Sequence, residues 1–178
     1  MGADKAFVTL DGRTLLARAL ELARSVTAEV RIVGDAAKFA AFAPVVEDVF
    51  RECGPLGGIH AALRASTAEL NLMLAVDLPF VTRSLLEYLI ERAQGSSAMV
   101  TVARAGGGWQ PLCALYRPEF GDAAEKALRQ GQYKIDTLFD PQRTQVIGEG
   151  ELKGRGFSPE TFRNLNTPEE LARAGGQG

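Results

Sequence analysis

Along the chain, short apolar runs alternate with segments in which apolar residues recur every three or four positions. This pattern predicts strands separated by helices. Strands are predicted where short runs are β-branched or continuously apolar, at residues 7–10, 29–33, 45–46, 70–76, 99–103, 112–116, 146–147 and 162–165. Helices are predicted where apolar residues recur every three or four positions, at residues 14–24, 36–43, 54–63, 82–92, 118–129 and from 167 onward. This alternation predicts an α/β fold in three layers, with helices on both faces of a mostly parallel central sheet.

Residue types at the ends of these segments support the boundaries. Thr82 is suited to cap the helix that follows it. Pro118 at a helix start and Gly131 beyond its end match the usual placement of proline and glycine. The pair Asp11-Gly12 predicts a turn after the first strand.

The strand at residues 70–76 is almost entirely apolar, as a strand covered on both faces requires. Asp77 follows it directly, and ligands of such sheets bind outside the carboxyl ends of the strands. Near phosphates, Mg²⁺ takes one or two protein carboxylates and fills its remaining positions with water and substrate oxygens. Asp77 is therefore a candidate metal ligand or base; the alternative is a turn-former before Leu78-Pro79.

The segment Gly54-Pro55-Leu56-Gly57-Gly58 is a second candidate site, because it leads into a predicted helix. Glycine lets a ligand approach the backbone closely, and the free N–H groups of a helix N-terminus attract anions or base edges. The alternative is that the glycines only allow tight packing at the start of the helix.

Four polar residues are weaker candidates. Lys5 is suited to bind phosphate, and Asp48 is expected near the same rim of the sheet; solvated surface positions are the alternative for both. Asn164 and Asn166 are suited to hydrogen-bond a ligand, or to cap the helix predicted next along the chain.

Composition excludes several classes of protein. The 178 residues include 20 Lys and Arg against 22 Asp and Glu, which gives no electrostatic case for binding nucleic acid or an anionic membrane. No apolar run approaches the roughly 18–20 residues of a membrane span. We expect one domain over residues 1–174, followed by a flexible tail at 175–178.

The few cysteines and the single histidine exclude other sites. Cys53 and Cys113 lie far apart and His60 is the only histidine, so no zinc-binding spacing exists. Two cysteines do not favour a disulfide-stapled secreted fold, and a cytoplasmic location is expected. No phosphate-loop or dinucleotide-binding motif is present, and His60 lacks a nucleophile elbow with which to form a serine triad.

Taken together, these motifs resemble the molybdenum cofactor guanylyltransferases, a group of Rossmann-like nucleotidyltransferases. The resemblance extends over essentially the whole chain. The segments that carry it are Met1-Gly2-Ala3-Asp4-Lys5-Ala6, Glu47-Asp48 with Gly54 to Gly58, Val76-Asp77-Leu78-Pro79 and Asn164-Leu165-Asn166-Thr167-Pro168-Glu169-Glu170-Leu171. A fifth segment, residues 110–116, has Gln110 and Leu112 where the family usually has His and Thr.

The resemblance implies a reaction. GMP would be transferred from Mg²⁺–GTP to the terminal phosphate of molybdopterin, with release of pyrophosphate. GTP and molybdopterin are the implied partners, together with molybdoenzyme apoproteins and other proteins of cofactor biosynthesis.

The resemblance also implies residue roles. Asp77 would hold Mg²⁺, and Lys5 would neutralise charge on the triphosphate. Asp48 would contact the nucleotide, and Asn164 and Asn166 would face molybdopterin. The backbone that would form the nucleotide pocket belongs to Gly54, Pro55, Leu56 and Gly58.

In this family a first strand and a Gly-Gly loop precede the segment that matches residues 1–6. We therefore expect an N-terminally truncated fold whose natural start lies about 10–20 residues upstream, the length of one strand and one loop. Three alternatives stay open: a molybdopterin cytidylyltransferase, a sugar-phosphate nucleotidyltransferase, and a non-catalytic member that binds nucleotide or cofactor.

Overall fold

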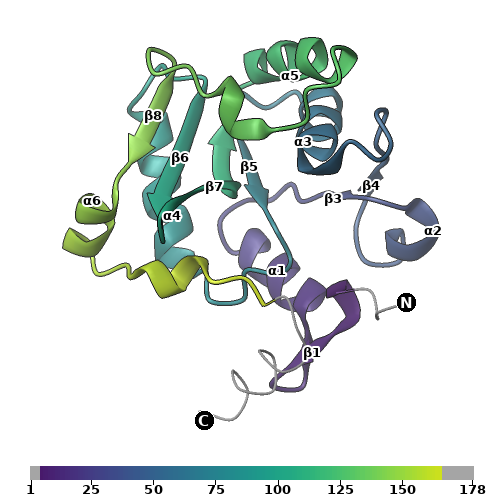
Figure 1. The fold of residues 1–178 in the computed structure, drawn as a ribbon. Helices are drawn as coiled ribbons and strands as arrows, with labels where there is room; N and C mark the ends of the chain where they lie inside the picture. The colour runs from purple at the N-terminus through teal and green to yellow at the C-terminus, as the bar shows by residue number, and fades with distance from the viewer. Residues whose placement is uncertain (1–4, 166–178) are drawn as a thin grey trace.

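A computed structural model describes residues 5–165, and its centre is a four-stranded sheet (Figure 1). The strand order is β5 (Asn71–Leu74), β7 (Gly108–Tyr116), β6 (Val100–Ala105) and β8 (Thr144–Ile147). Strands β5 and β6 both pair antiparallel with β7, whereas β8 is parallel to β6. Three of the four strands therefore run in one direction and β7 is reversed, so the sheet is mixed.

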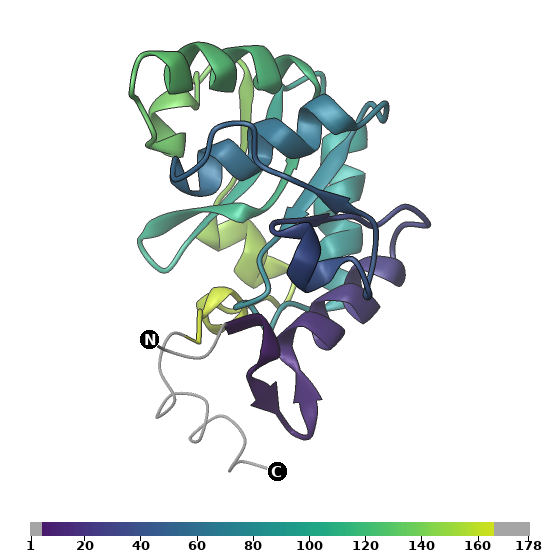
Figure 2. The same cartoon turned by 90° about the vertical axis from the view of Figure 1, so that its right-hand side faces the viewer.

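Two helices cover one face of this sheet, α3 (Gly54–Ala65) and α5 (Glu119–Arg129), which lie side by side in Figure 2. Helix α5 follows Pro118, and Gly131 beyond it has a φ of 72°, as the sequence predicted. The core on this face is formed by buried side chains of both helices and of β6 and β7, among them Leu56, Ile59, Val102, Tyr116, Phe120 and Ala124.

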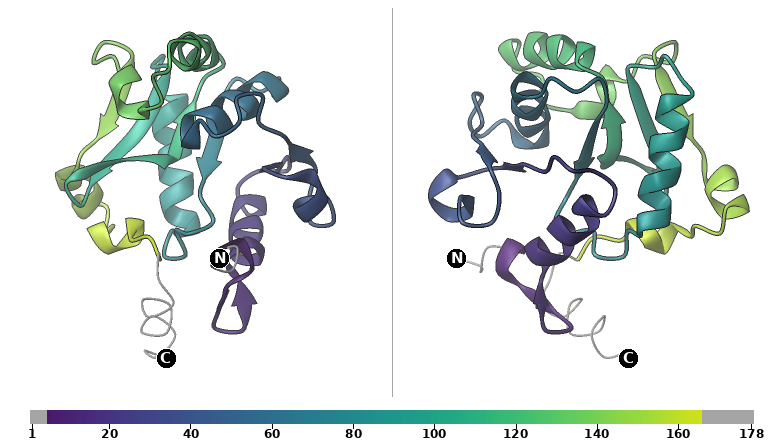
Figure 3. Two further views of the ribbon diagram at one scale, coloured as in Figure 1. Left: turned by 45° about the vertical axis from the view of Figure 1, so that its right-hand side comes forward. Right: turned by 180° about the vertical axis from the view of Figure 1, so that it is seen from behind.

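The opposite face is covered by α4 (Arg83–Gln94), which crosses the sheet in the right panel of Figure 3, and by the short helix α6 (Glu149–Gly154). The Thr82 hydroxyl accepts a hydrogen bond from the Leu85 N–H at 3.3 Å, which confirms the predicted cap. Helices on both faces confirm the three-layer prediction. Helix α6 was not predicted, because its glycines conceal a helical pattern.

The N-terminal elements lie beside the central sheet. They are η1 (Lys5–Phe7), the hairpin β1 (Thr9–Leu10) and β2 (Arg13–Thr14), α1 (Leu15–Arg24), β3 (Ile32–Val33), α2 (Ala36–Phe39) and β4 (Val45–Val46). The hairpin turns at Asp11 and Gly12, where φ is 52° and 76°. Strands β3 and β4 form a separate parallel pair, and no pairing among residues 5–165 joins them to the central sheet.

One predicted strand is wrong. Residues 162–165 do not pair in a sheet; instead Pro159–Phe162 is a 3-10 helix, η3, that buries Phe162 against the α4 side of the core. Another 3-10 helix, η2 (Ile135–Leu138), precedes β8. The helix expected from residue 167 and the tail at 175–178 lie outside the described residues. Within residues 5–165, no helix is long and apolar enough to cross a membrane.

Candidate active site

The charged candidates Lys5 and Asp77 lie together in space. Asp77 lies in the turn that follows β5, and Lys5 begins η1. Lys5 Nζ is 3.8 Å from Asp77 Oδ2, and the two side chains are 50% and 22% exposed. The pair presents both signs of charge near the carboxyl end of a sheet strand, which is where this class of sheet binds ligands.

Two backbone hydrogen bonds hold the segment around Asp77. The Leu165 N–H donates to the Asp77 carbonyl at 3.0 Å, so the segment that contains Asn164 reaches this site. The Ala75 N–H donates to the Leu112 carbonyl at 2.8 Å, which joins the site to the first half of β7.

Two further residues from the sequence motifs are Gln110 and Asn166. Gln110 donates its side-chain amide to the Ala105 carbonyl at 3.0 Å, so this amide bonds within the β6–β7 hairpin. Asn166 lies outside the described residues, and its role stays a prediction.

The second predicted site lies at the start of α3, against the loop 47–53. A Cβ atom on Gly57 would lie 2.8 Å from the Phe50 carbonyl oxygen, and one on Gly58 would lie 3.7 Å from Asp48 Oδ1. Close packing therefore accounts for Gly57, whereas a Cβ on Gly58 would make only ordinary van der Waals contacts. Cys53 at the N-cap makes no side-chain hydrogen bond to the first turn of α3. The amides there are suited to bind an anion or a base edge.

Asp48 brings an acidic group to this helix start. Its Oδ1 atom is buried and has no hydrogen-bond partner among the described residues. Burial raises the pKa of Asp48, and the charge of His60 opposes this rise. A buried carboxylate oxygen without a protein donor is suited to accept a hydrogen bond from a ligand.

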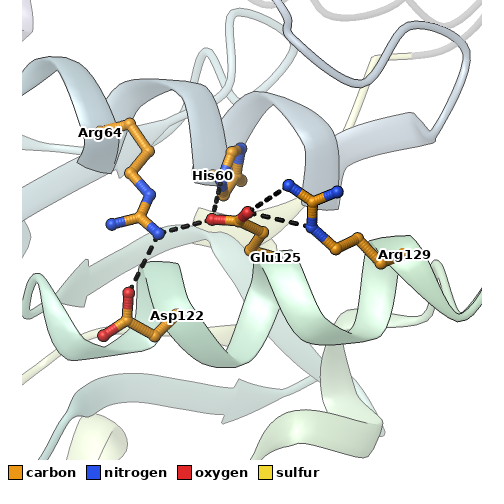
Figure 4. A network of polar contacts seen from close by, with 5 residues as sticks. All are labelled: His60, Arg64, Asp122, Glu125 and Arg129. Atoms are coloured by element: carbon orange, nitrogen blue, oxygen red, sulfur yellow. Dashed lines mark hydrogen bonds and ion pairs between the residues drawn. The ribbon is translucent and has the colours of Figure 1, made fainter.

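A polar network that was not predicted from the sequence joins α3 to α5 (Figure 4). His60 Nε2 lies 3.6 Å from Glu125 Oε2. Glu125 also accepts hydrogen bonds from Arg64 at 2.5 Å and from Arg129 at 2.7 and 3.0 Å. The bonds from Arg64 and Arg129 lower the pKa of Glu125 to about 2. The helical spacing of His60 and Arg64 was the available signal, but only the packing of two helices brings Glu125 to them.

A cavity of about 360 Å³ lies between α1 and the segment after β5. Its walls include Leu15, Leu22, Leu74 and Val76, and neither Lys5 nor Asp77 lines it. Val76 and Leu78, on either side of Asp77, line the cavity, whereas the charged pair itself does not, so the candidate site rests on the charged groups and helix amides.

Known proteins resemble this chain over nearly its full length. The molybdenum cofactor guanylyltransferase of Pseudomonas aeruginosa is 33% identical over 175 residues, covering 96% of this chain and 85% of the relative. A probable molybdenum cofactor guanylyltransferase of Pelotomaculum thermopropionicum is 32% identical over 176 residues, covering 98% and 85%.

Solved structures agree with these relatives. Molybdopterin-guanine dinucleotide biosynthesis protein A of Archaeoglobus fulgidus superposes with a TM-score of 0.83 at 28% identity, covering 97% of this chain and 89% of the other. A 2-C-methyl-D-erythritol 4-phosphate cytidylyltransferase of Thermus thermophilus, 20% identical over 96% of this chain and 92% of the other, shares the fold at a TM-score of 0.70. The model of the MobA-like NTP transferase domain matches residues 1–146. This chain therefore belongs to the MobA-like NTP transferase family.

Proposed function

We propose that the protein transfers GMP from GTP to molybdopterin and so forms the guanine dinucleotide form of the molybdenum cofactor. The observation that carries this proposal is the identity of about one third, over nearly the whole chain, to molybdenum cofactor guanylyltransferases. The charged pair at Lys5 and Asp77 supports it, because nucleotidyl transfer needs positioning and charge stabilisation rather than a protein nucleophile.

In the proposed reaction, an oxygen of the terminal phosphate of molybdopterin attacks the α-phosphorus of GTP. The bond between the α-phosphorus and the bridging oxygen breaks, and pyrophosphate leaves with the bonding electrons. Lys5 then offsets the negative charge that develops on the leaving phosphates. The Lys5 ammonium is half exposed beside Asp77, so a phosphate group can reach it from solvent.

Asp77 is the proposed Mg²⁺ ligand. Its carboxylate is partly exposed in a turn, and no cluster of three candidate ligands exists among residues 5–165. A single carboxylate fits Mg²⁺ that shares its remaining positions between water and phosphate oxygens. Bound Mg²⁺ would polarise the phosphate oxygens; Asp77 orients it, and Lys5 remains the neighbouring protein cation.

The nucleotide is proposed to lie at the start of α3. The Asp48 carboxylate would accept a hydrogen bond from it, and the backbone of Gly54, Pro55, Leu56 and Gly58 would line its pocket. The absence of a side-chain cap at Cys53 and the buried Oδ1 of Asp48 support this placement. Asn164 and Asn166 are proposed to face molybdopterin, since the neighbouring Leu165 is bonded to the backbone of Asp77.

The proposed setting is the cytoplasm, in a single domain that spans residues 1–174. GTP and molybdopterin are the proposed substrates, and molybdoenzyme apoproteins and other cofactor-biosynthesis proteins are further proposed partners.

Isotope transfer tests the reaction. With GTP labelled at the α-phosphate, the label should appear in the molybdopterin product, whereas label at the γ-phosphate should appear in pyrophosphate. Product without α-label, or transfer of the γ-phosphate, would contradict the proposal.

A further inference from the structure

His60 is a buried polar side chain that the proposed reaction does not use. Its side chain is 4% exposed, and among residues 5–165 only Thr101 is a comparably buried polar residue. Both ring nitrogens are buried without a hydrogen-bond partner, since Glu125 Oε2 at 3.6 Å from Nε2 lies beyond a good hydrogen bond. A buried ring whose polar atoms lack hydrogen-bond partners lowers the stability of the fold, so a role other than stabilisation is expected for it.

The ring of His60 contacts the loop that carries Asp48. It packs edge-on against the ring of Phe50, with centroids 5.1 Å apart at an interplanar angle of 76°. Gly57 lies three residues before His60 and so on the same face of α3. There the Phe50 carbonyl oxygen approaches so closely that a Cβ would lie 2.8 Å from it. Phe50 is therefore held against α3 by both its backbone and its ring.

Phe50 also contacts helix α5. The Arg129 guanidinium lies 5.8 Å from the centroid of its ring, and Arg129 pairs with Glu125. The Phe50 ring thus has the imidazole of α3 and the guanidinium of α5 as neighbours. This arrangement fixes the loop two residues after Asp48.

His60 also influences Asp48 electrostatically. Its charge acts against the rise in the pKa of Asp48 that burial causes. The charged groups that surround His60 on the loop, α3 and α5 are Asp48, Arg64, Asp122, Glu125 and Arg129.

We propose that His60 is a positioning residue for the nucleotide: its ring holds Phe50 and the loop 47–53 against α3, and so places the Asp48 carboxylate at the start of that helix. The inference rests on the proposed function, because it requires that Asp48 contacts the nucleotide.

The test compares His60→Gln and His60→Phe with the parent protein. The KM for GTP and kcat are measured in a pyrophosphate-release assay, together with the melting temperature of each variant. His60→Gln removes the ring that packs on Phe50, so the KM for GTP should rise by about two- to tenfold. His60→Phe keeps an aromatic ring at this position, so its KM should stay close to that of the parent protein. The KM should change more than kcat, because the ring contacts the loop that carries Asp48.

Asp48→Asn is the matched control, because it removes the group that His60 is proposed to position. It should raise the KM for GTP, and adding His60→Gln to it should raise that KM little further. A lower melting temperature in His60→Gln with an unchanged KM would show a purely structural role and overturn the inference alone. An unchanged KM in Asp48→Asn would instead overturn the nucleotide contact of the proposed function, and this inference with it.

Discussion

Lys5 Nζ lies 3.8 Å from Asp77 Oδ2, although one residue lies in the opening segment and the other follows a strand of the central sheet. The pair is partly exposed, and exposed ion pairs contribute little to stability, typically about 0–1 kcal/mol. We therefore assign the pair to binding rather than to stability: it places a cation and a carboxylate where phosphates and a metal ion are proposed to bind.

Asp77→Asn should reduce turnover about a hundredfold or more, because the amide removes the charge that holds Mg²⁺. Folding should change little, since the side chain lies in a partly exposed turn. Steady-state rates across a Mg²⁺ titration, together with urea unfolding, check both expectations. Near-normal rates at ordinary Mg²⁺ concentration would place the metal elsewhere.

Lys5→Gln should lower kcat/KM for GTP by roughly ten- to a hundredfold, through loss of one charge-assisted contact to phosphate. Lys5→Arg keeps the positive charge and should retain part of the activity, which makes it the matched control. Steady-state kinetics of both variants give the comparison. Equal losses in the two variants would mean that shape rather than charge at Lys5 matters.

Gly57→Ala should destabilise the protein by about 1–3 kcal/mol, because its Cβ would lie 2.8 Å from the Phe50 carbonyl oxygen. The displaced loop should also raise the KM for GTP. Gly150→Ala is the control: Gly150 lies in α6 with open space around its Cβ position, and alanine there should be neutral or stabilising by up to about 1 kcal/mol. Chemical denaturation measures both, and a neutral Gly57→Ala would refute the close approach.

Asp48→Asn should stabilise the folded protein while it weakens nucleotide binding. Burial raises the pKa of Asp48 in the folded state, so ionisation favours the unfolded chain as the pH rises from the ordinary value of 3.8 through the raised one. The melting temperature of Asp48→Asn should therefore exceed that of the parent protein at neutral pH. This difference should shrink as the pH falls toward 4.

Two measurements on the same variant check this trade-off. A thermal scan at several pH values gives the stability, and the KM for GTP should rise about tenfold with the loss of a hydrogen bond to a charged group. A destabilised Asp48→Asn at neutral pH would show that Oδ1 has a protein partner after all.

Local patterns were sufficient to predict most of the fold. Thr82, Pro118 and the apolar strand before Asp77 carry signals that lie within a few residues of each element, and all three elements form. The strand does not have the full cover on both faces that its apolar sequence predicted, because β5 lies at the edge of the four-stranded sheet and its residues are only partly buried. The strand predicted at residues 162–165 was wrong. Phe162 is apolar because it packs into the core, but it does so from a 3-10 helix rather than from a strand. The reversed direction of β7 arises from pairing partners that a single segment does not encode.

The candidate site was predicted residue by residue but not as an arrangement. Asp77 was predicted as a site residue because it follows an apolar strand. The start of α3 was predicted as a binding site because glycines precede the helix. The proximity of Lys5 to Asp77 and of Phe50 to Gly57 depends on how distant segments pack. His60 was dismissed as a triad member, and its contacts with Phe50 and Glu125 come from two elements far apart in the sequence.

The central claim is guanylyl transfer to molybdopterin, and nucleotide selectivity of the purified protein tests it most directly. Pyrophosphate release should be measured with molybdopterin and Mg²⁺ in the presence of GTP, CTP or ATP, with Asp77→Asn as the inactive control. We predict that kcat/KM is highest with GTP, that release requires molybdopterin, and that the product carries GMP. Preference for CTP, or release that a sugar phosphate supports better than molybdopterin does, would contradict the claim.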